Sequence, residues 1–235
     1  MIVENNKDLK KFLSEYKSKD SIIIPISSDE RKHPLDTDIC LLYVHTFDEE
    51  YVLPLRHNEC LNIDMPNLES KTKKYTIDKK RLLHFLDLDN VIDVTMLNYM
   101  NRGVGLDLDN LDTDAHSFLN MRFYKKPNMN RVIPVLKHIE KCRSIVKTLI
   151  DIIENNEQPV NVSYNNEILD NLSFIEKNGL ITTEGKVFSE YNLYTSTGRP
   201  SNRFGGINFA ALNKKDGSRK KFISRFKNGV LVEMD

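Results

Sequence analysis

Residues 22–55 read IIIPISSDERKHPLDTDICLLYVHTFDEEYVLPL, and this stretch sets the expected fold of the N-terminal part of the chain. It contains three apolar runs rich in Ile, Leu, Val and Tyr, at 22–26, 39–46 and 51–55. Short runs of this kind between polar, turn-forming residues are typical of buried strands. Asp48 and Glu49 connect the last two runs, which predicts a β-hairpin at the edge of a sheet.

Helical periodicity surrounds these strands. Apolar residues recur at the spacing of one helix face before the first strand and again after the third. The predicted helices span 7–17, 78–86, 94–100, 107–119, 132–153 and 165–178. The last of them is expected to stop at Gly179, and a loop or linker is expected over 182–190. The pattern predicts an α/β region.

Composition and charge distribution restrict the class of protein. The 235 residues are 40% hydrophobic and 29% charged, which is ordinary for a soluble globular protein of one large or two smaller domains. Lys plus Arg and Asp plus Glu balance at 34 each. Residues 87–114 nevertheless carry seven aspartates and one arginine, whereas 195–227 carry nine basic residues and the single acid Asp216. A polyanion is the natural partner of such a basic window.

Cysteine and histidine spacing gives no sign of a metal site. Cys40, Cys60 and Cys142 are scattered, so neither a disulfide framework nor a zinc site is indicated and a reducing cytoplasm is expected. The six histidines lack ligand spacing. No apolar run approaches membrane-spanning length and the N-terminus is not a signal peptide, so no membrane partner is expected.

The C-terminal stretch carries the most specific motifs. Residues 191–235 read YNLYTSTGRPSNRFGGINFAALNKKDGSRKKFISRFKNGVLVEMD. The order and spacing of the Thr-Gly-Arg turn, Asn208, Arg219 with Phe222, and the run ending at Asp235 resemble the entrance to the polymerase palm of family A DNA polymerases of the phage type. From the residues alone, 230–232 should be a buried strand, because a β-branched run follows the turn signal Asn-Gly.

The resemblance implies roles for individual residues. It makes Asp235 the catalytic carboxylate and a metal ligand of a two-Mg²⁺ centre for nucleotidyl transfer. It places Arg219 on the phosphates of the incoming deoxynucleoside triphosphate, where a planar guanidinium gives paired hydrogen bonds. Primer–template DNA is expected to contact residues that precede both of these in the sequence: Thr197, Gly198, Arg199, Asn208, Lys214 and Lys215.

The region before this stretch resembles the 3′–5′ exonuclease-type domain of the same family, which has an RNase H-like fold. Three strands followed by helices give the order, and VIDVTMLNYM at 91–100 resembles a segment of that domain. The positions of the metal-binding acids are filled by Ile26, Ser28, Leu82 and Asn128, which cannot hold two divalent ions. Loss of exonuclease activity is therefore predicted.

The resemblance divides the chain into three parts. A degenerate exonuclease-like domain is expected over 1–145, a helical connector with a reduced or missing thumb over 146–190, and the start of the palm over 191–235. The run that ends at Asp235 resembles motif A, the first metal-binding strand of the palm in this family. The chain is therefore expected to be the N-terminal part of a polymerase of DNA replication. It should be inactive until a C-terminal polymerase fragment completes it, in the cytoplasm of a host cell if it is viral.

Two alternatives belong to other functional classes. The chain could be a non-catalytic DNA-binding module with an exonuclease-like fold. It could also be an active nuclease that uses Asp29, Glu30 and Asp93, although solvated turn and helix-cap roles account for acid pairs such as Asp29 with Glu30.

Overall fold

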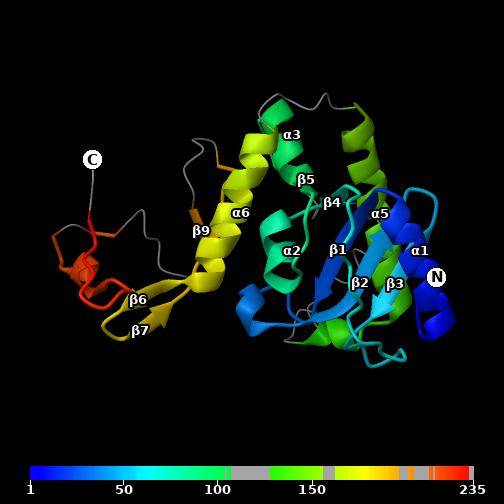
Figure 1. The fold of residues 1–235 in the computed structure, drawn as a ribbon, viewed down its shortest axis with the longest axis horizontal. Helices are drawn as coiled ribbons and strands as arrows, with labels where there is room; N and C mark the ends of the chain where they lie inside the picture. Colours follow the sequence, from blue (N-terminus) through cyan, green and yellow to red (C-terminus); the bar gives the residue numbers. More distant parts are fainter. Residues whose placement is uncertain are drawn as a thin grey trace.

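The computed structural model describes residues 1–103, 105–106, 128–155, 162–195, 201–203, 212–213 and 215–232. Its centre is a five-stranded sheet in the order β3-β2-β1-β4-β5 (Figure 1). β1 pairs antiparallel with β2, and β2 with β3, whereas β4 lies parallel to β1 and β5 parallel to β4. The strands are β1 (Ser21–Ser27), β2 (Ile39–His45), β3 (Glu50–Pro54), β4 (Lys74–Thr76) and β5 (Val91–Asp93). This arrangement is RNase H-like, and the predicted α/β fold class is confirmed.

Apolar clusters cover both faces of the sheet, which explains why successive residues of the central strand β1 are apolar. Ile22, Ile24 and Ile26 belong to the cluster that packs against α5 (Val135–Asn155), whereas Ile23 belongs to the cluster on the other face. A strand buried on both faces has no polar alternation. The helices α1 (Asn6–Ser18) and α2 (Lys79–Phe85) contribute to the second cluster, and α3 (Val94–Arg102) to the first.

The helices begin where the sequence supplies caps. The Asn5 side chain accepts hydrogen bonds from the amides of Lys7 and Asp8 at the start of α1. α5 starts directly after Pro134, which fits a residue whose ring disrupts a helix interior but not a helix start. α5 runs across residue 145, while the division into 1–145, 146–190 and 191–235 stays a prediction.

A hairpin replaces the loop predicted over 182–190, so that prediction was wrong. α6 (Val162–Asn178) ends at Gly179, which has a φ of +59°, and the chain enters the paired strands β6 (Leu180–Thr182) and β7 (Gly185–Val187). The Thr182 hydroxyl donates to the carbonyl of Gly185 at 2.8 Å and closes the tight turn. β8 (Glu190–Asn192) then pairs with β9 (Ser201–Arg203). The helix predicted over 107–119 lies outside the described residues.

We call residues 191–232 the C-terminal segment, and the end of this segment lies away from the sheet (Figure 1). After β9, the described residues form the short helix η5 (Ser218–Lys221), and Phe222 pairs with Thr182 of β6 in an isolated bridge. The chain then continues without helix or strand to residue 232 (Figure 1). The predicted buried strand at 230–232 is wrong: the three residues form no strand and are 63–79% exposed. An apolar run becomes a buried strand only where a neighbouring strand and a core receive it, and within the described residues neither lies beside this run.

No helix in the described part of the chain is long and apolar enough to cross a membrane.

Two further 3₁₀ turns, η1 (Pro34–Asp36) and η3 (Met129–Arg131), lie near the end of β1. The Asn130 side chain of η3 donates to the carbonyl of Ser27 at 2.8 Å, which fixes this turn to the strand end.

Candidate functional site

The end of β1 is the position at which the resemblance expects metal-binding carboxylates. The Ile26 side chain instead belongs to the apolar cluster, and the Ser28 hydroxyl lies 2.8 Å from the hydroxyl of Thr37. Asn128 has a φ of +59° and precedes η3 without a side-chain capping bond. None of these three side chains is anionic.

A positive charge of the protein itself lies at this strand end. Arg81, on α2, donates from Nη2 to the Ser27 hydroxyl at 3.0 Å, and its Nε lies 3.3 Å from a Glu30 carboxylate oxygen. Its Nη1 is 3.9 Å from Glu190 Oε2. Leu82, which the sequence placed at the acid position, points into the core with no exposed surface. The α2 residue that faces the end of β1 is therefore Arg81.

The acids proposed for an active nuclease are each held in other roles. Asp29 pairs with the Arg31 guanidinium at 2.9 Å. Burial acts to raise the pKa of Asp29, but the hydrogen bonds from the Arg31 side chain and amide and the charges of Arg31 and Lys32 together keep that pKa below its usual range. Glu30 accepts from the amide of Ser27 at 2.9 Å. No three His, Cys, Asp or Glu side chains within the described residues could hold a metal ion. The residues at the end of β1 do not fit a pair of divalent cations.

Asp93 is the N-cap of α3 and a junction between three parts of the chain. Its carboxylate accepts from the amides of Met96 and Lys79, both at 2.7 Å, and from the Tyr194 hydroxyl at 3.1 Å. Burial, with the charge of Asp78 adding to it, raises the pKa of Asp93 to about 7. This acid binds backbone and hydroxyl donors as the N-cap of α3.

A buried charge cluster joins α2 to α6; we use this name for Lys80, His84 and Glu176. Lys80 Nζ lies 2.6 Å from Glu176 Oε1, and His84 Nε2 lies 3.0 Å from Glu176 Oε2. The side chains of His84 and Glu176 have no exposed surface, and that of Lys80 is 5% exposed. A separate pair, Lys79 with Asp170 at 2.8 Å, joins the same helices nearer the surface.

Two predicted site residues lie in the described part of the C-terminal segment. Arg219 donates from Nε and Nη2 to the carbonyl of Leu212, at 3.3 and 3.2 Å. Lys215 is exposed, and its amide binds the side chain of Asn213. The other predicted site residues lie outside the described residues: Thr197, Gly198, Arg199, Asn208, Lys214 and Asp235.

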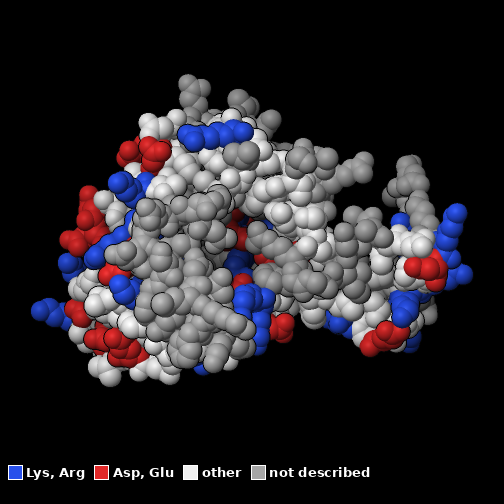
Figure 2. All heavy atoms as spheres, turned by 180° about the vertical axis from the view of Figure 1, so that it is seen from behind, with Lys and Arg blue, Asp and Glu red and all other residues white. Residues whose placement is uncertain are grey.

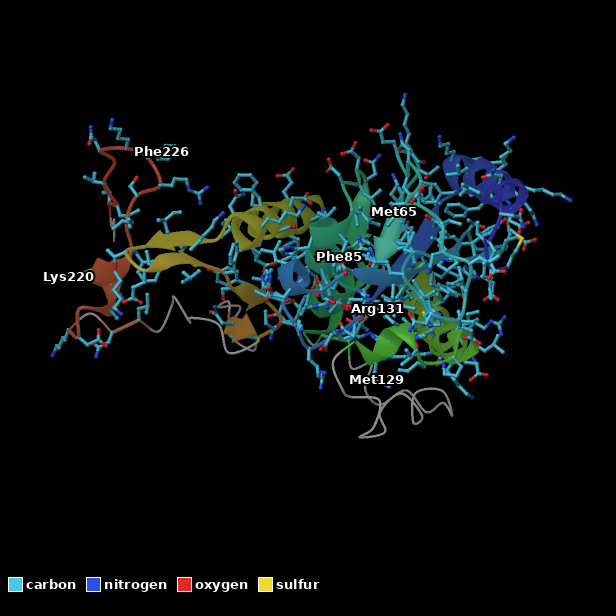
Figure 3. All side chains as sticks on the ribbon, turned by 90° about the horizontal axis from the view of Figure 1, so that it is seen from below. Met65, Phe85, Met129, Arg131, Lys220 and Phe226 are labelled. Atoms are coloured by element: carbon cyan, nitrogen blue, oxygen red, sulfur yellow. The ribbon has the colours of Figure 1, made fainter. Side chains whose placement is uncertain are left out.

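The described end of the C-terminal segment presents basic and apolar side chains to solvent. Lys and Arg atoms gather at this end of the molecule, with Asp and Glu atoms beside some of them (Figure 2). One such neighbour is Glu184, whose carboxylate lies 2.8 Å from Lys221 Nζ. Lys220 and the 74% exposed Phe226 lie far from Arg131 and the sheet (Figure 3).

No protein-family model matches this chain, and no curated protein matches it. Among solved structures, the chain is similar to the catalytic core of RRP6 from Trypanosoma brucei, with 16% identity over 72% of this chain and 50% of that one and a TM-score of 0.45. RNase D from Trypanosoma brucei shows 12% identity over 75% of this chain and 72% of that one, with a TM-score of 0.49.

A polymerase is also similar to this chain. The POL domain of Pol1 from M. smegmatis, in complex with DNA primer–template and dNTP, shows 14% identity over 77% of this chain and 32% of that one, with a TM-score of 0.44. The chain thus spans half of the RRP6 core and a third of the Pol1 chain. At these identities and TM-scores the likenesses establish no activity.

Proposed function

We propose that this chain is the N-terminal part of a family A DNA polymerase, in which an exonuclease-like domain without nuclease chemistry carries a DNA-binding palm segment. One observation carries the proposal. The chain leaves an RNase H-like sheet through α6 and β8 and enters a Thr-Gly-Arg sequence followed by the basic window. That order is the one the sequence resemblance requires.

In this proposal the exonuclease-like domain binds no catalytic metal. Arg81 lies where a nuclease needs carboxylates, and its guanidinium pairs with Glu30 and lies 3.9 Å from Glu190, so these acids are engaged with a side chain of the protein itself. The chemistry belongs to the palm, where Asp235 would be one ligand of the Mg²⁺ pair and a C-terminal polymerase fragment would supply the rest. Thr197, Gly198, Arg199 and Asn208 would contact the primer–template.

Arg219 would bind the triphosphate of the incoming nucleotide. In the structure its Nε and Nη2 bind the Leu212 carbonyl, so nucleotide binding requires that this contact be exchanged or shared. A guanidinium has five N–H donors, which permits sharing. Arg219→Lys should therefore weaken nucleotide incorporation by the completed enzyme more than it weakens DNA binding, because lysine lacks the planar fork.

The DNA-binding part of the proposal is tested by fluorescence anisotropy with a labelled primer–template. Replacing three exposed lysines of the C-terminal segment, Lys215, Lys220 and Lys227, by alanine should weaken binding about tenfold or more at low salt and lower the dependence on salt. The matched control replaces three exposed lysines of α1, Lys10, Lys11 and Lys17. Equal losses in both triple variants would show that the basic segment has no special role.

A non-catalytic DNA-binding module is the second candidate, because nine basic residues against one acid in 195–227 account for DNA binding without any catalytic group. The two candidates differ when the chain is combined with the polypeptide encoded beside it. Only the polymerase candidate expects nucleotide incorporation that disappears in Asp235→Ala. DNA binding without incorporation in every such mixture would favour the module.

A further inference from the structure

The segment Glu190–Asn192 and the three residues after it are hydrogen-bonded to α2, α3 and α6; we call residues 190–195 the anchored segment. The amide of Tyr191 donates to Glu176 Oε1 at 2.7 Å, and the carbonyl of Tyr191 accepts from Lys80 Nζ at 2.6 Å. Both backbone groups of one residue are thus bound by the buried charge cluster.

Burial makes this arrangement costly. Removing a carboxylate and an ammonium from water costs several kcal/mol per ion, and their attraction alone often does not compensate. Here Glu176 accepts from Lys80, His84 and the Tyr191 amide, and Lys80 donates to a backbone carbonyl as well as to Glu176. The cluster therefore fixes the position of a chain segment, which an apolar pair of the same volume could not do.

Two tyrosines hold the remainder of the anchored segment. The Tyr99 hydroxyl of α3 donates to the carbonyl of Thr195 at 2.7 Å, and the Tyr194 hydroxyl donates to Asp93 at 3.1 Å. The two rings meet edge to face with centroids 5.7 Å apart. Thr195 is the first residue of the Thr-Ser-Thr-Gly-Arg sequence.

From these contacts we infer that the exonuclease-like domain, together with α6, serves as an anchor that positions the entry to the DNA-binding segment. This inference rests on the proposed function. Lys80, Glu176 and Tyr99 are positioning residues that act through the backbone of the anchored segment. α2 and α6 thereby hold the part of the chain that leads to the proposed DNA-binding segment.

The Lys79–Asp170 pair provides a matched control. It joins the same two helices, and Lys79 is as deeply buried as Lys80, with a side chain 5% exposed. Lys79 Nζ binds Asp170 and the carbonyl of Asn166, both on α6. Loss of the Lys79 ammonium perturbs the packing of α2 on α6 but removes neither of the hydrogen bonds that Glu176 and Lys80 make to Tyr191, nor the one that Tyr99 makes to Thr195.

The test compares Tyr99→Phe, Lys80→Met and Lys79→Met in the full chain. Hydrogen exchange at 190–195, thermal stability and affinity for a labelled primer–template are measured for each. We expect Tyr99→Phe and Lys80→Met to accelerate exchange in the anchored segment about tenfold and to weaken DNA affinity about fivefold. Lys79→Met should leave both within twofold, even where it lowers the melting temperature as much.

Accelerated exchange with unchanged DNA affinity would overturn the inference, and so would equal loss of affinity in Lys79→Met. Tyr99→Phe removes only a hydroxyl, so it keeps the test decisive if Lys80→Met does not fold. If the unmodified chain binds no primer–template, the proposed function fails. In that case unchanged exchange in Tyr99→Phe would separately refute the anchor.

Discussion

Apolar side chains are buried in the sheet-bearing part of the molecule and exposed at the end of the C-terminal segment. In the sheet, Leu42 and Leu53 have no exposed surface, and helices cover both faces. In the C-terminal segment, Leu231 and Val232 are 63% and 72% exposed. The first part holds itself together by burial, whereas the second presents an apolar run together with basic side chains.

This difference indicates which part depends on a partner. Exposed apolar runs are common at surfaces that bind other molecules. The sheet-bearing part has its own core on both faces and also binds the start of the C-terminal segment through Tyr191 and Thr195. We therefore expect its stability to be independent of DNA and of a completing chain.

The largest expected contrast comes from one substitution made in both regions. Leu42→Ala should lower the free energy of unfolding by about 2–5 kcal/mol, because it leaves a cavity between the sheet and its helices. Leu231→Ala should change it by less than about 0.5 kcal/mol, because that side chain is already in water. Urea unfolding measures both, and similar losses would contradict the contrast.

Acid sensitivity should belong to the sheet-bearing part. Burial, aided by the nearby charges of His57 and Lys141, lowers the pKa of His138 to about 4. Because the folded pKa lies below the unfolded value of about 6.5, the contribution of His138 is complete above that pH and is lost as the pH falls toward 4. The loss amounts to roughly 3 kcal/mol.

His138→Gln should flatten the stability curve between about pH 4 and 6.5, measured by urea unfolding across that range.

Asp93 contributes with the opposite sign, since its raised pKa makes the folded state less stable as the pH rises from about 4 to 7. Asp93→Asn should remove that decline. An unaltered curve in both variants would show that neither side chain is buried as described.

The junction between the two regions should respond to one glycine more than to another. A Cβ at Gly179 would lie 2.5 Å from the carbonyl oxygen of Val187, whereas at Gly103 nothing lies within 4 Å, although both have a positive φ. Gly103→Ala should cost about 1 kcal/mol from backbone strain alone. Gly179→Ala should cost more and should speed hydrogen exchange in β6 and β7.

Equal exchange in both glycine variants would mean that β7 does not close on the end of α6.

The sequence was sufficient for features that depend on local patterns. The strands β1 to β3 follow from apolar runs, and the end of α6 follows from Gly179. β4 and β5 were not predicted, because each is three residues long and is held by parallel pairing with distant strands. The strand expected at 230–232 failed for the converse reason, since local propensity without a pairing partner does not make a strand.

The candidate site was only partly accessible from sequence. The absence of carboxylates at Ile26 and Ser28 could be read directly from the sequence, but the inward orientation of Leu82 and the position of Arg81 depend on the rotation of α2. The pairing of Lys80 with Glu176 joins residues 96 apart. Lysine and glutamate are rarely buried, so no local sequence pattern predicts such a buried pair.

The central claim is that the exonuclease-like domain carries DNA without cutting it. The most direct test incubates the purified chain with end-labelled primer–template and Mg²⁺, and follows binding and strand length in the same samples. We expect a salt-sensitive complex in which the DNA keeps its full length, in the presence or absence of Mg²⁺. Shortening of the 3′ end that requires Mg²⁺ and persists in Asp235→Ala would contradict it.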